Sequence, residues 1–66
     1  MNWDQVEGKW KELSGKVQGQ WGKLCNYDLD VIKGSRTELE SRLQRYYGYA
    51  AENAKSEVDA WLSQLK

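Results

Sequence analysis

The chain of 66 residues contains no histidine, no proline and no phenylalanine, and its only cysteine is Cys25. A single cysteine excludes a disulfide within the chain, and the lack of histidine removes the commonest metal ligand. The sequence therefore excludes a zinc finger, and it predicts neither a metal nor any other cofactor. Because a domain this short buries little surface, it needs a core built from its largest side chains.

An excess of charge of either sign is also missing, since ten Lys and Arg side chains are mixed with ten Asp and Glu side chains. A dedicated nucleic-acid binder would typically carry a basic stripe, which this pattern does not provide. No apolar run is long enough for a signal peptide or a membrane span, so we expect neither. A lone thiol without an export signal favours a cytoplasmic location. The mean hydropathy of −0.91 indicates a hydrophilic protein.

Large aromatic side chains are abundant, with four tryptophans and four tyrosines. Each buries about 150–250 Å² when it enters a core. We therefore expect the indoles to supply much of the core: Trp3, Trp10, Trp21 and Trp61.

A glycine-lysine triplet recurs three times at intervals of seven residues: Gly8-Lys9-Trp10, Gly15-Lys16-Val17 and Gly22-Lys23-Leu24. Seven residues make two helical turns, so the third residue always falls on one apolar face and the glycines on the other. We expect an amphipathic helix capped by Asn2 and extending to about residue 22. Its glycines weaken it, and we predict a break between Gly15 and Gly22 that leaves a long helix followed by a short one. The stripe could pair with a second chain, but packing on the chain's own C-terminal helix is favoured.

Local signals place further short helices downstream. Cys25 or Asn26 can cap a brief helix over 28–32, where Asp28 and Asp30 suit the helix dipole. Gly34 ends it, and the next helix begins with a capping box over 35–38.

In that helix, Glu38 is spaced to pair with Arg42 on the outer face, and Gly48 is placed as its C-terminal cap. The last helix is expected from about residue 49 or 50 nearly to Lys66. No segment has the alternation of a strand, so the sequence predicts one all-α domain of four to five short helices over 1–66.

These residues resemble the CsbD-like family over essentially the whole chain. The residues that carry the resemblance are Gly8-Lys9-Trp10, Gly15-Lys16-Val17, Gln20-Trp21-Gly22-Lys23-Leu24, Gly34, Arg36, Leu39, Gln44, Tyr46-Tyr47-Gly48-Tyr49, Ala54, Glu57-Val58-Asp59 and Trp61. The resemblance implies two roughly orthogonal helical hairpins in a sterile-alpha-motif-like array, and a role in the bacterial general stress response. It implies no catalytic, cofactor-binding or metal-binding residue. Cys25 departs from the family, whose members tend to have a small polar cap such as threonine there.

Candidate chemistry is sparse. Asp28 and Asp30 are two residues apart and point to different sides of a helix, so we interpret them as solvated residues rather than a catalytic pair. With Asn26 they match the start of a calcium-binding EF-hand loop, but Val31 and Thr37 stand where glycine and glutamate are required. The acidic neighbours of Cys25 oppose a reactive thiolate, so we interpret it as a small residue at a helix start.

We therefore expect a non-enzymatic bacterial stress-response protein, protective or partner-binding, whose partner the sequence does not identify. The alternative is a nucleic-acid-binding module that uses the Gly34 turn, with Lys33 and Arg36 contacting phosphate. In that case the tyrosines at 46, 47 and 49 would stack on bases, although core and rim positions explain them more simply. Self-association through the first helix is a further alternative.

Overall fold

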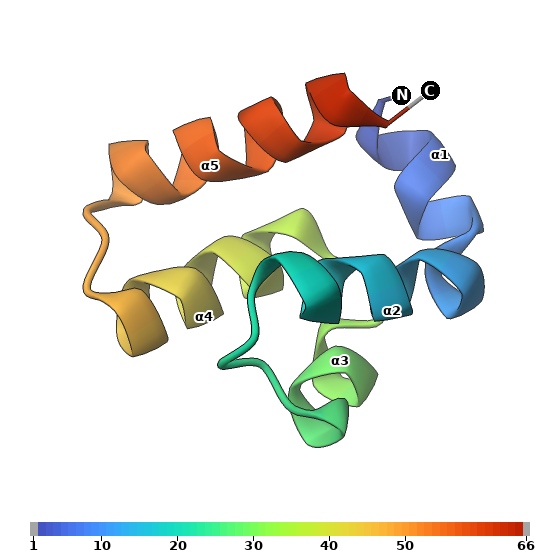
Figure 1. The fold of residues 1–66 in the computed structure, drawn as a ribbon, viewed down its shortest axis with the longest axis horizontal. Coiled ribbons are helices and arrows are strands. Elements are labelled where there is room, and N and C mark those ends of the chain that lie inside the picture. Colours follow the sequence, from blue (N-terminus) through green and yellow to red (C-terminus); the bar gives the residue numbers. More distant parts are fainter. Residues whose placement is uncertain (1, 66) are drawn as a thin grey trace.

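The structure is a computed structural model that describes residues 2–65; Met1 and Lys66, the two ends of the predicted domain, lie outside the described residues. The described residues form five helices and no strand, as Figure 1 shows. The helices are α1 (Trp3–Gly8), α2 (Trp10–Gln20), α3 (Asn26–Ile32), α4 (Arg36–Tyr47) and α5 (Ala51–Gln64). The predicted all-α class is confirmed. The five helices agree with the predicted four to five.

The N-terminal helical region begins as predicted and contains one break that the sequence did not predict. Asn2 and Gln5 form a capping box, each side chain accepting a bond from the other's backbone N–H. The helix then breaks at Lys9, whose φ of −114° and ψ of 25° separate α1 from α2. The predicted order of a long helix and then a short one was therefore wrong. The predicted break between Gly15 and Gly22 is present, because α2 ends at Gln20. Helix α2 continues through Gly15, where Leu13 and Val17 on either side are buried in the core.

Two left-handed residues connect α3 to α4. Lys33 has a φ of +46° and Gly34 a φ of +84°. Ser35 then caps α4 by accepting the Glu38 N–H at 3.3 Å. Only this half of the predicted capping box forms, because the Ser35 N–H donates instead to the Ile32 carbonyl at 2.8 Å.

Helices α4 and α5 form an antiparallel hairpin, side by side in Figure 1, and make the most extensive helix pairing in the described chain. Gly48 ends α4 with a φ of +71°, and its N–H donates to the Gln44 carbonyl at 3.0 Å, as predicted. Helix α3 packs against α4, and α1 turns toward the end of α5.

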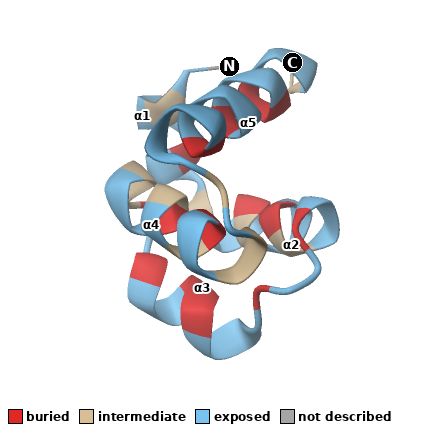
Figure 2. Cartoon of the chain, turned by 90° about the vertical axis from the view of Figure 1, so that its left-hand side faces the viewer, coloured by how far each residue is buried: buried red, intermediate tan, exposed pale blue. Residues whose placement is uncertain are grey.

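The core collects apolar side chains from all five helices and from the segment between α2 and α3. Figure 2 shows the buried positions along the inward faces of the helices. The buried apolar residues are Val6, Leu13, Val17, Trp21, Leu24, Leu29, Ile32, Leu39, Leu43, Ala54, Val58, Trp61 and Leu62. The radius of gyration of 10.7 Å agrees with the roughly 11 Å of a compact domain of this length.

The four indoles form one chain of contacts. Trp3 lies 6.4 Å from Trp10 and 6.4 Å from Trp61, and Trp21 lies 5.7 Å from Trp61, measured between ring centroids. Trp21 and Trp61 are buried, whereas Trp3 and Trp10 are half-buried around them. The N-terminal stripe thus packs on the chain's own C-terminal helix, as the sequence favoured.

We predict opposite effects from adding a methyl group at two glycines. A Cβ at Gly34 would lie 3.2 Å from the Glu7 Cα atom, at a φ that L-residues rarely adopt, so Gly34→Ala should destabilise the protein by about 1–3 kcal/mol. A Cβ at Gly15 meets nothing within 4 Å, and Gly15→Ala should stabilise it by about 0.5–1 kcal/mol. Urea unfolding followed by tryptophan fluorescence measures both. Equal stability of Gly34→Ala and wild type would contradict the close packing of this turn on α1.

Candidate functional site

Asp28 is the only charged side chain that is buried among residues 2–65, with 2% of its surface exposed. Its Oδ1 atom accepts bonds from Arg42 Nη1 and from the Tyr46 hydroxyl, both at 2.6 Å. Its Oδ2 atom accepts the Cys25 backbone N–H at 2.9 Å, and the Cys25 thiol donates to the same atom at 3.2 Å. Four donors therefore surround one carboxylate.

Local structure explains how these groups meet. Cys25 is the N-cap of α3, so the side chain three residues later reaches back to its N–H. Arg42 and Tyr46 are one helical turn apart on α4 and present the same face to α3. Although Cys25 departs from the usual cap residue, the Asp28 carboxylate satisfies the start of the helix.

The environment keeps Asp28 ionised. Its pKa is lowered from 3.8 to about 2, first by the Cys25 backbone N–H and next by the Tyr46 hydroxyl, with smaller contributions from the Cys25 thiol and Arg42. Burial acts in the opposite direction but is outweighed. Because all four bonds stabilise the charged form, this carboxylate is suited to hold helices together rather than to transfer protons near neutral pH.

The sequence interpretation of Asp28 as a solvated residue was therefore wrong, whereas Asp30 is exposed as expected. The predicted Glu38–Arg42 pair is also replaced, because Arg42 turns to the buried Asp28 instead. One signal was present in the sequence. An acid three residues after a helix start is the second half of a capping box, which turns the carboxylate back toward the N-cap backbone N–H.

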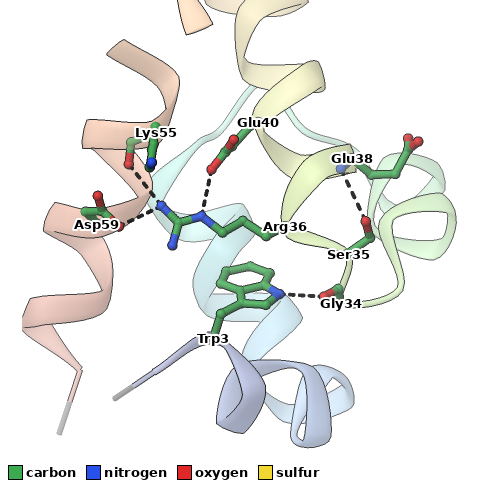
Figure 3. Close-up of polar contacts among 8 residues, drawn as sticks. All are labelled: Trp3, Gly34, Ser35, Arg36, Glu38, Glu40, Lys55 and Asp59. Carbon is green, nitrogen blue, oxygen red and sulfur yellow. Dashed lines mark hydrogen bonds and ion pairs between the residues drawn. The ribbon is translucent and has the colours of Figure 1, made fainter. Parts of the chain in front are cut away.

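The Gly34 turn, proposed above as a phosphate site, is largely occupied by contacts within the chain (Figure 3). Gly34 is buried, and its carbonyl accepts the Trp3 indole N–H at 2.6 Å. Arg36 points to α5, where its Nη2 donates to Asp59 at 2.6 Å and to the Lys55 carbonyl at 3.3 Å. Its Nε donates to Glu40 at 2.6 Å.

Two carboxylates thus compensate the Arg36 charge, and they raise its pKa against the opposing effect of burial. Of the two cationic side chains predicted to contact phosphate, only Lys33 is exposed.

The tyrosines near the end of α4 contact one another and their neighbours. The Tyr46 hydroxyl binds Asp28, and the Tyr47 ring stacks on Tyr49 at 5.5 Å with an interplanar angle of 10°. The Lys23 ammonium lies 4.9 Å from the Tyr47 ring centroid and donates to the Tyr46 carbonyl at 3.2 Å. All three rings are half-buried, which agrees with core and rim positions.

The described residues provide neither a metal site nor a membrane-spanning helix, and the Cys25 thiol has a partner within the chain. Cys25 is exposed, and its thiol donates to the Asp28 carboxylate, which the other donors hold in its ionised form. Within residues 2–65, no three His, Cys, Asp or Glu side chains are grouped so that they could hold a metal ion. None of the described helices combines the length and the apolar character needed to cross a bilayer.

These features define a small all-α domain whose polar side chains mainly join its own helices. The chain belongs to the CsbD-like family, whose model matches residues 4–56. It is 50% identical to the UPF0337 protein RPA4217 of Rhodopseudomonas palustris over the full length of both chains. The UPF0337 protein ECA0631 of Pectobacterium atrosepticum is 51% identical, and the match covers 92% of this chain and 88% of the relative.

The UPF0337 protein YjbJ of Escherichia coli K12 is 44% identical over the same shares of the two chains. No solved structure matches the chain. The family expected from the ordered glycines and tryptophans is therefore confirmed.

We predict that Asp28→Asn lowers the free energy of unfolding at pH 7 by about 2–4 kcal/mol, because Arg42 then loses its buried partner. Asp30→Asn, on the exposed side of the same helix, is the matched control and should change it by less than about 0.5 kcal/mol. The stabilisation by Asp28 is complete above pH 3.8 and is lost as the pH falls toward about 2. Urea unfolding between pH 7 and pH 2 should therefore show wild type and Asp28→Asn converging at low pH. A constant difference would contradict the assignment.

Proposed function

We propose that this chain is a non-enzymatic stress-response protein of the cytoplasm, with a protective role that depends on how completely α1 and α2 are folded. The stress role rests on the resemblance to the CsbD-like family. The conditional folding rests on one observation: Gly15 and Gly19 lie inside α2 although an added methyl group would meet nothing within 4 Å. Each glycine costs about 1 kcal/mol of helix stability relative to alanine, and no packing constraint requires it.

The lengths and contacts of α1 and α2 also support conditional folding of the N-terminal half. Helix α1 has six residues and is separated from α2 at Lys9, so neither is long enough to be stable alone in water. Both are held by tertiary contacts. The indole N–H of Trp3 reaches the Gly34 carbonyl, and that of Trp10 reaches the Leu29 carbonyl at 3.2 Å.

Lower water activity favours compact states, because osmolytes are excluded from protein surface. Osmolyte should therefore complete the folding of the weaker half of this domain. A chain that gains order as water is withdrawn could respond to stress without a reaction centre.

We predict that amide hydrogen exchange in plain buffer is faster in α2 than in α5, and that 1 M sucrose slows exchange in α2 more than in α5. The variant with both Gly15→Ala and Gly19→Ala should already be protected in plain buffer and should gain less from sucrose, since its helix is intrinsically stronger. Lys16→Arg, which exchanges an exposed side chain of the same helix for one of similar helix propensity, is the control and should behave like wild type. Equal protection of α2 and α5 without sucrose would contradict the proposal.

The nucleic-acid alternative stays a prediction, and a replacement of Arg36 is not a suitable test of it. Because Arg36 joins α4 to α5, replacing it would disturb the fold as well as any binding. Lys33→Ala changes only an exposed side chain, and Lys16→Ala on α2 is its control. In a filter-binding assay at low and moderate salt, the protective role predicts no retention of DNA or RNA. Retention that Lys33→Ala abolishes and Lys16→Ala preserves would favour the alternative.

A further inference from the structure

A hollow of about 250 Å³ lies beside the start of α5. Its lining residues are Tyr49, Glu52, Asn53, Ser56 and Glu57. We name it the Tyr49 hollow. None of these residues takes part in the bonds around Asp28 or in the contacts of the Gly34 turn, so the hollow is separate from both.

One wall of the Tyr49 hollow is aromatic. The Tyr49 ring is half-buried, and it is fixed by stacking on Tyr47. The stacked pair already takes one cation, since the Lys23 ammonium lies against the Tyr47 ring. Aromatic faces carry negative charge density and attract ammonium groups.

The other residues that line the hollow give it a net negative charge, because no cationic side chain is among them. Glu52 and Glu57 are carboxylates, Asn53 and Ser56 are neutral, and no Lys or Arg lines the hollow. Burial, followed by the charge of Glu57, raises the pKa of Tyr49, and a hydrogen bond from the Tyr49 hydroxyl to Glu57 also contributes, so this carboxylate lies at the hydroxyl end of the ring. A ring held by stacking and two carboxylates therefore line the same small hollow.

We propose that the Tyr49 hollow binds a small organic cation of the alkylammonium class. The ring face complements the alkyl part of such a cation, and Glu52 and Glu57 complement its charge. A bare metal ion fits this lining less well, because two carboxylates supply few of the six to eight oxygens that calcium takes. The hollow also exceeds the roughly 30 Å³ of one water molecule several-fold, which leaves room for an alkylated nitrogen. Because the site is open to water, the expected dissociation constant is about 1–10 mM.

Titration of the full chain with tetramethylammonium chloride, followed by ¹⁵N–¹H NMR, tests the proposal. Amide signals of residues 49–57 should shift and saturate in the millimolar range. Sodium chloride at the same concentration controls for ionic strength, and tert-butanol is a neutral molecule of similar shape. Neither should give saturating shifts at these residues.

Variants then separate the ring from the charge. Tyr49→Leu and Glu57→Gln should each weaken binding at least about fivefold, whereas Tyr49→Phe keeps the ring and should stay within about twofold of wild type. Glu38→Gln, an exposed carboxylate at the opposite end of the hairpin, is the matched control and should leave the affinity unchanged. Shifts that do not saturate, equal shifts from tert-butanol, or unchanged affinity in Glu57→Gln and Tyr49→Leu would overturn the assignment. These outcomes are independent of the exchange behaviour of α2.

Discussion

The position of α3 depends on the Asp28 carboxylate, because its oxygens accept bonds from the start of α3 and from one face of α4. A buried carboxylate is costly unless donors surround it, so the pairing of these helices and the ionisation of Asp28 require each other. Once α3 is in place, the Leu29 and Gly34 carbonyls near its end are available to Trp10 and Trp3. The two indole hydrogen bonds of the N-terminal helices therefore depend on the position that Asp28 gives to α3, while the Trp3–Trp61 contact attaches the same helices to α5.

This dependence divides the molecule into parts of different intrinsic strength. The hairpin of α4 and α5 has helices of 12 and 14 residues, a left-handed glycine cap and an Arg36–Asp59 bridge. The N-terminal part has helices of six and 11 residues with open glycines, and it relies on indole contacts. The proposed protective role concerns the weaker part, whereas the Tyr49 hollow belongs to the stronger one. A rigid wall is what a small binding site needs, and the Tyr47–Tyr49 stack supplies it.

Much of the fold could be predicted because its signals are local. The seven-residue repeat gave the apolar stripe, and Asn2, Ser35 and Gly48 gave helix ends within a residue or two. The break at Lys9 was missed, since nothing in its neighbours differs from the later glycine-lysine triplets.

The sequence by itself determined the all-α class, the helix ends set by caps and glycines, and the family, because each depends on residues close together in the chain. Only the tertiary structure decided the pairings between helices. Arg42 and Tyr46 lie 14 and 18 residues from Asp28, and Arg36 lies 23 residues from Asp59. Helical spacing offered Arg42 a nearer partner in Glu38, but an exposed pair contributes little, whereas a buried carboxylate without donors costs much more. The Tyr49 hollow was likewise not visible in the sequence, since it depends on how the Tyr47–Tyr49 stack lies against the start of α5.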